Sequence, residues 1–168
     1  MGEKCCGLAV TALKWGMARP LTSSSTLFMA AWSYTNAMRL MLPTIYDEGS
    51  HNLGGPYGLL SGFALELGLK AALRGRGASD KQLGKISHDL HEALAGVLRE
   101  GLVLSDSRRV SRLIDLMHPV HLNHLMRYIP ADVESITMPD PNFALEVTVG
   151  LLEDIERQVP KIAAMMPS

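Results

Sequence analysis

Apolar residues recur along this chain at the spacing of α-helices. Between residues 27 and 41 they fall on one helical stripe, and the preceding run from Ser23 to Thr26 offers N-terminal caps. A second apolar helix is expected from Pro56 to about Arg74, where Gly75 follows. No segment keeps the two-residue alternation of a half-buried strand, and no internal repeat is evident. The pattern predicts an all-α fold, an up-and-down bundle of about five helices.

Caps and prolines predict three further helices. They span about 87–101, 105–117 and 140–158. Asp89 and Glu92 form a pair typical of a capping box at the start of the first of these. Pro119 is expected to interrupt the next one after Met117, before a separate short segment at 121–128. In the last helix, Asp140 is the expected cap and Pro160 the stop.

Composition indicates one domain. The chain has 168 residues, 47% of them hydrophobic and 20% charged, which is enough for one substantial core. No apolar run is long enough to span a membrane, so we expect a soluble, cytoplasmic protein with no membrane association. Cys5 and Cys6 are adjacent and provide neither a disulfide framework nor a zinc ribbon, which fits a reducing compartment. We expect residues 1–22 to form a flexible N-terminal arm and residues 23–168 to form the helical domain.

Charge is unevenly distributed along the chain. The formal net charge is −1, but residues 70–127 hold ten Lys and Arg against six Asp and Glu, and the remainder holds six against eleven. This distribution favours a modest basic face for an anionic partner. Arg74 and Arg76 stand beside glycines at a predicted helix end, and Arg108 and Arg109 follow further along. No Walker-type or dinucleotide-binding glycine motif is present, so no nucleotide cofactor is predicted from a motif.

Two of the predicted helices carry a recognisable pattern of charged residues. Glu66 and Lys70 lie one turn apart in the favourable order for an ion pair inside the run ALELGLKAAL. After a glycine-rich break comes His88-Asp89-Leu90, where Asp89 is a natural helix cap. One interpretation places Lys70 and His88 beside a phosphate or nucleotide, with Glu66 orienting the lysine. We favour a structural role for Glu66, Lys70, His88 and Asp89, because pairing and capping explain them without a ligand.

These motifs resemble the HEPN superfamily (higher eukaryotes and prokaryotes nucleotide-binding), whose members often show an E-L-x-L-K-A-x-L helix, a glycine turn and H-D-L. Arg127-Tyr128 looks like an Arg-Tyr pair that many of its noncatalytic members carry before the last helix. The resemblance implies a homodimer and a binding or regulatory module for RNA, a nucleotide or an antitoxin-like protein partner, in a toxin–antitoxin or defence system. No cofactor or metal is expected in this interpretation. The residues expected to bind the partner are Arg74, Arg76, Arg108, Arg109, His121, His124, Arg127 and Tyr128.

A second interpretation is a metal-independent ribonuclease. Many HEPN ribonucleases carry R-x4-6-H at a dimer interface, and Arg112 and His118 match that spacing. The resemblance assigns phosphate neutralisation to Arg112 and proton transfer from the attacking 2′-hydroxyl to His118, which is sound acid–base chemistry. The chain departs from the pattern at Leu113, where family nucleases usually have Asn, Asp or His. Six residues of separation also put the pair far apart around a regular helix.

A third interpretation is a metal-dependent helical-bundle enzyme. His118, His121 and His124 follow one another at intervals of three, so they could converge on one side of a tight helical turn. Neutral imidazoles suit zinc and other transition metals, and His88, His91 or Glu92 are possible distant contributors. Leu122 and Leu125 instead indicate a segment that packs on the core. In that case His121, His124 and Arg127 line a polar groove or make ordinary hydrogen bonds.

Overall fold

All regular structure in the described part of the chain is helical. A computed structural model describes residues 23–46, 53–125 and 136–163. In chain order the elements are α1 (Ser24–Met41), the short 3-10 helix η1 (Leu42–Thr44), α2 (Gly54–Gly75), α3 (Asp80–Ile86), α4 (Leu90–Arg99), α5 (Ser107–Leu122), α6 (Pro141–Gln158) and α7 (Pro160–Ala163). No strand occurs among these residues, which confirms the predicted all-α bundle. A topology specific to HEPN proteins stays a prediction.

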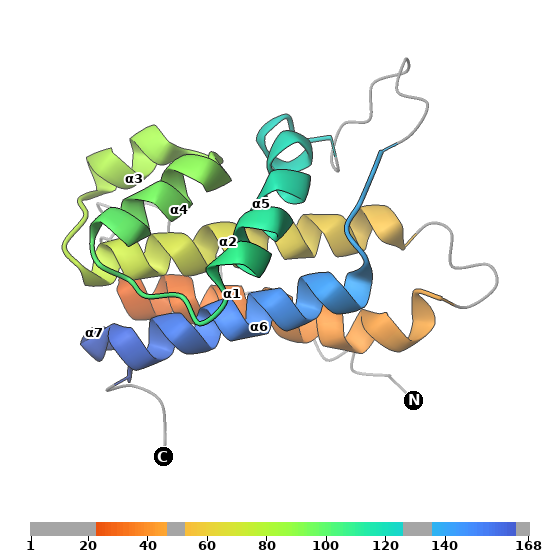
Figure 1. The fold of residues 1–168 in the computed structure, drawn as a ribbon, viewed down its shortest axis with the longest axis horizontal. Helices are drawn as coiled ribbons and strands as arrows, with labels where there is room; N and C mark the ends of the chain where they lie inside the picture. Colours follow the sequence, from red (N-terminus) through yellow and green to blue (C-terminus); the bar gives the residue numbers. More distant parts are fainter. Residues whose placement is uncertain (1–22, 47–52, 126–135, 164–168) are drawn as a thin grey trace, which may run out of the picture.

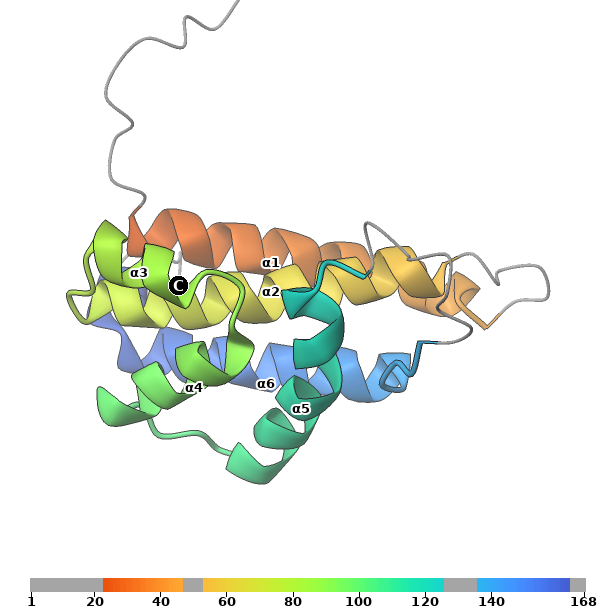
Figure 2. The same cartoon turned by 90° about the horizontal axis from the view of Figure 1, so that it is seen from above.

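Helix α2 is the centre of the molecule. Figure 1 shows α1, α2 and α6 side by side along the long axis, with α2 antiparallel to α1 and parallel to α6. Helices α3, α4 and α5 cover one side of this trio, and α5 crosses the long helices steeply (Figure 1, Figure 2). Within the described residues, α2 contacts each of the other α-helices. Its buried residues therefore sit where side chains from the whole bundle meet.

Small residues let neighbouring elements approach α2 closely. A Cβ atom on Gly68 would lie 2.7 Å from Cδ2 of Leu152, and one on Gly75 would lie 2.2 Å from Cγ1 of Val159. Such separations are shorter than van der Waals contact, so any larger residue would push α6 or the start of α7 away. The apolar layer around these glycines is fully buried and includes Leu65.

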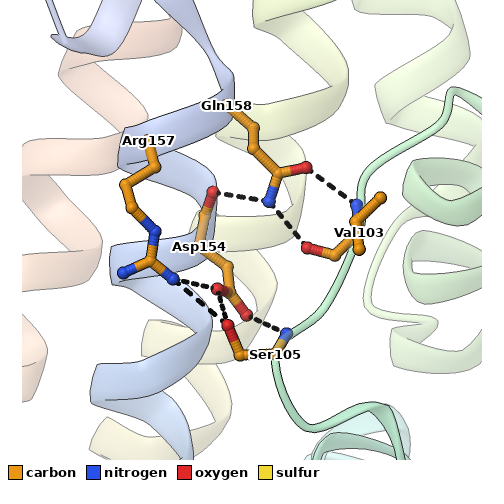
Figure 3. A network of polar contacts seen from close by, with 5 residues as sticks. All are labelled: Val103, Ser105, Asp154, Arg157 and Gln158. Atoms are coloured by element: carbon orange, nitrogen blue, oxygen red, sulfur yellow. Dashed lines mark hydrogen bonds and ion pairs between the residues drawn. The ribbon is translucent and has the colours of Figure 1, made fainter.

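The loop between α4 and α5 is bonded to α6, as Figure 3 shows. Buried Asp154 accepts hydrogen bonds from the backbone N–H and the Oγ of Ser105, at 2.8 and 2.6 Å. One turn on, the amide of Gln158 exchanges two hydrogen bonds with the backbone of Val103, at 2.6 and 2.8 Å. Arg157 forms an ion pair with the carboxylate of Asp154. These bonds fix the start of α5 on α6.

Three predicted helix caps are confirmed. The side chains of Ser23, Asp89 and Asp140 each accept a hydrogen bond from the backbone N–H three residues ahead, at 3.0, 2.9 and 2.9 Å. Helix α6 ends at Gln158 as predicted, and Pro160 begins the short α7. The predicted pair of Glu66 and Lys70 is also confirmed, with 2.6 Å between Nζ and Oε1.

The prediction that Pro119 interrupts the fourth helix after Met117 was wrong. Helix α5 continues to Leu122, and residues 123–125 are a turn rather than the separate segment expected. Proline removes one backbone donor and crowds the preceding turn. Here Met117 and Val120 are buried on either side of it, so packing on the core holds the helix together.

Helix α3 was not predicted. It begins with a capping box, in which Ser79 accepts from the N–H of Gln82 at 3.3 Å and Gln82 accepts from the N–H of Ser79 at 2.8 Å. With seven residues and one buried apolar side chain, Leu83, it has little helical periodicity. Within the described residues, no helix has the length and apolar character needed to cross a bilayer.

Candidate functional site

Three cationic or polar side chains contact one buried carboxylate on one face of α2. Glu66 is 5% exposed and accepts hydrogen bonds from Lys70 Nζ at 2.6 Å, His88 Nδ1 at 2.8 Å and His121 Nε2 at 2.6 Å. Lys70 binds Oε1, whereas both histidines meet Oε2. The donors come from α2, from the turn before α4 and from the end of α5. We call Glu66, Lys70, His88 and His121 the Glu66 cluster.

The hydrogen bonds keep the Glu66 carboxyl ionised despite its burial. Burial alone would raise its pKa, because a low-dielectric environment disfavours the charged form. The hydrogen bonds from His121, Lys70 and His88 outweigh burial and lower the pKa of Glu66 from 4.5 to about 2. The cluster is thus a buried anion with positive or polar partners on both oxygens.

Local backbone features place the histidines. Gly62 leaves room for the His121 ring, since a Cβ there would lie 2.3 Å from Nδ1. Ser87, with φ 50°, turns the chain just before His88, and His124 lies past the end of α5 with φ 54°. The rings of His88 and His124 are 4.7 Å apart between centroids, so His124 stands at the outer edge of the Glu66 cluster.

The remaining described histidines form a separate pair. The rings of His91 and His118 are 4.4 Å apart, and Asp89 and Asp115 lie near them at 3.7 Å from His118 and 3.6 Å from His91. Burial and the neighbouring His91 lower the pKa of His118. The structure therefore does not bring His118, His121 and His124 to one point: His118 faces α4, whereas His121 reaches Glu66.

The predicted pair Arg112 and His118 is not brought together within one chain. The exposed guanidinium of Arg112 lies 5.9 Å from the centroid of the Phe143 ring on α6, whereas His118 contacts His91 on α4. A ribonuclease site shared between two subunits stays a prediction.

The predicted anion-binding arginines have different surroundings. Arg74 forms an ion pair with Asp80 and donates to the carbonyl of Ala78, and Arg109 pairs with Glu146. Arg108 is exposed on the first turn of α5. Arg76 donates to the carbonyl of Glu100. Arg127 and Tyr128 lie outside the described residues.

Arg76 lines a cleft between the end of α2, α3 and α4. The cleft has a volume of about 520 Å³. Its cationic side chains are Arg76, Lys85 and Arg99, its acidic ones are Glu92 and Glu100, and its other lining residues are Leu73, Gly77, Ala78, Gln82, Ile86 and Gly96.

Arg76 was predicted from the sequence, but Lys85, Arg99 and the apolar wall of the cleft were not. The missing element was α3, which turns Lys85 and Ile86 toward α4. Its signal was present in the Ser79-x-x-Gln82 spacing of a capping box. The convergence of His88 and His121 on Glu66 had no local signal, because these residues are 22 and 55 positions away in sequence.

No protein-family model, curated protein or solved structure matches the chain.

Proposed function

We propose that the protein is a HEPN-like binding module whose ligand is a nucleotide, held in the cleft between α2, α3 and α4. The observation that carries the proposal is the combination of three cationic side chains and an apolar wall in one cleft of about 520 Å³. Ligand pockets of roughly 300 to 1,000 Å³ are usual for molecules of nucleotide size. Pairing in a homodimer and an antitoxin-like partner remain predictions from the resemblance.

The charges favour a phosphate on the α3 side of the cleft. Arg99 is paired with Glu92 at 2.6 Å, so its charge is largely neutralised. Lys85 is exposed and forms no ion pair with the described residues. Arg76 uses one Nη in the bond to Glu100, and its Nε is buried, whereas its second Nη forms no hydrogen bond with the described residues. Because a guanidinium has five donors, Arg76 can bind a phosphate oxygen together with Lys85.

The apolar part of the cleft suits a flat base. Leu73 and Ile86 contribute aliphatic surface, and Gly96 and Ala78 project little into the space between them. Nucleotide sites commonly combine an apolar wall for the base with a few polar groups for the phosphates.

Binding of a fluorescent adenine nucleotide to the full chain tests the proposal. Lys85→Glu should weaken binding about tenfold, because one phosphate contact is replaced by a repulsion of roughly 1 to 2 kcal/mol. Lys81→Glu is the matched control, since Lys81 is an exposed lysine of α3 that does not line the cleft. The control should bind as the unmodified protein does.

Two outcomes contradict the nucleotide proposal. One is the absence of nucleotide binding, and the other is an equal loss in Lys81→Glu and Lys85→Glu, which indicates general charge attraction. A parallel gel-shift titration with single-stranded RNA at several salt concentrations identifies the second case. Binding that falls steeply with salt and responds to both lysines points to the RNA backbone as the ligand.

A further inference from the structure

Two imidazole nitrogens and one carboxylate oxygen meet in the Glu66 cluster. The ligand atoms of Glu66, His88 and His121 all lie within 4.8 Å of one another. This donor set is the one that zinc hydrolases and mononuclear non-haem iron sites use. We propose that Glu66, His88 and His121 form a binding site for a divalent transition-metal ion. This site is distinct from the nucleotide cleft and does not depend on it.

The distances are within reach of metal coordination. When each metal–ligand bond is about 2.1 Å, two ligand atoms of one ion are at most about 4.2 Å apart. No two of the ligand atoms are more than 4.8 Å apart, so a pair needs to close by at most roughly half an ångström to come within this limit. The two contacts to Oε2, at 2.8 and 2.6 Å, need to open by a similar amount. His88 is 32% exposed and can make this adjustment by rotating its side chain.

Lys70 and Gly62 orient the ligands. Lys70 holds Oε1 at 2.6 Å, which leaves Oε2 directed at both histidines. Such outer hydrogen bonds commonly fix the carboxylate of a metal site. The positive charge of Lys70 also opposes a second cation, so we expect weaker binding than in a thiolate site. Because Gly62 has no side chain, the His121 ring packs directly on α2, and in this position its Nε2 reaches Glu66.

The outer side of the site offers a route in and a further ligand. His88 is partly exposed, and the ring of His124 lies 4.7 Å from it. On the inner side, Phe63 meets the His121 ring edge-on at 5.5 Å. An ion bound at Glu66 would thus keep a fourth position on the solvent side, for water or for His124. Sites with one open position are typical of catalytic or ligand-binding metals rather than structural ones.

Zinc titration of the chelator-treated full chain, purified without a histidine tag, tests the site. The titration uses a Cys5→Ser/Cys6→Ser background, because adjacent thiolates bind Zn²⁺ themselves. We expect one Zn²⁺ per chain by calorimetry. His88→Gln should weaken binding at least tenfold, whereas His91→Gln, which changes an exposed histidine outside the site, should leave it unchanged.

The proposal is overturned if Zn²⁺ does not bind, or if His88→Gln binds as tightly as His91→Gln. X-ray absorption of the zinc-loaded background protein gives a second readout that needs no histidine variant. Two imidazoles and a carboxylate in the coordination shell support the assignment. A third imidazole is expected only where His124 takes the fourth position, and a shell with fewer than two or more than three imidazoles refutes the assignment.

Discussion

Replacing Glu66 by Gln should remove a pH dependence from the stability of the fold. The pKa of Glu66 is about 2 in the folded protein, against an ordinary value of 4.5 that is expected in the unfolded chain. A group with a depressed folded pKa stabilises the protein above its unfolded pKa, and this contribution is lost as the pH falls toward the folded value. Since each pKa unit corresponds to 1.36 kcal/mol, a difference of about 2.5 amounts to about 3 kcal/mol.

About 2 kcal/mol of this contribution should disappear between pH 5 and pH 3, because that interval covers most of the range between the two pKa values. Gln has no carboxyl group to titrate. The difference in unfolding free energy between the unmodified protein and Glu66→Gln should therefore shrink by about 2 kcal/mol across this interval. Other carboxyl groups, including that of Asp140, are common to both proteins and cancel in the comparison.

Urea unfolding followed by far-UV circular dichroism at pH 7, 5, 4 and 3 measures this difference. A difference that stays constant to within about 0.5 kcal/mol from pH 5 to pH 3 would refute the assignment of the low pKa to Glu66. Should Glu66→Gln fail to fold, carbon-13 NMR of the carboxyl groups in the unmodified protein decides the matter. The Glu66 signal should then show no titration between pH 6 and pH 3.5.

Packing and buried polar contacts give two more predictions. Gly62→Ala should lower the unfolding free energy by about 1 to 2 kcal/mol, because the added Cβ displaces the His121 ring. Gly150→Ala, in the middle of α6, should raise the unfolding free energy by about 0.5 to 1 kcal/mol, because alanine favours the helix and its Cβ meets no other atom. Chemical denaturation compares the two, and equal effects would argue against the close contact. Asp154→Ala should cost about 1 to 3 kcal/mol and speed amide hydrogen exchange in the loop before α5, whereas exposed Glu153→Ala should do neither. Unchanged exchange in Asp154→Ala would show that other contacts hold this loop.

Short-range signals in the sequence predicted most of the long helices and their ends. Caps such as Ser23, Asp89 and Asp140 act over three residues, and the Glu66–Lys70 pair acts over four, so each is visible in a short window. Pro119 misled the prediction because its local cost is offset by burial of residues far away in sequence. Helix α3 was missed because seven residues are too few to show a period.

The candidate sites depend on contacts that no local pattern encodes. His121 is one of three evenly spaced histidines in the sequence, yet its neighbours are decided by where α5 crosses α2. That crossing depends on Gly62 and on the attachment of the loop before α5 to Asp154. Arg76 was identified from its place at a helix end, but the rest of its cleft required α3 to fold back beside α4. Long-range packing, rather than residue chemistry, was the missing information.

The glycines of α2 also provide a means of recognising distant relatives of this chain. Gly62, Gly68 and Gly75 each receive a side chain from another element, namely His121, Leu152 and Val159. A related protein with a larger residue in place of one of these glycines needs a smaller or displaced partner side chain, so the two positions should change together. A search that scores these three coupled pairs, rather than overall identity, can detect the same bundle after the surface has diverged.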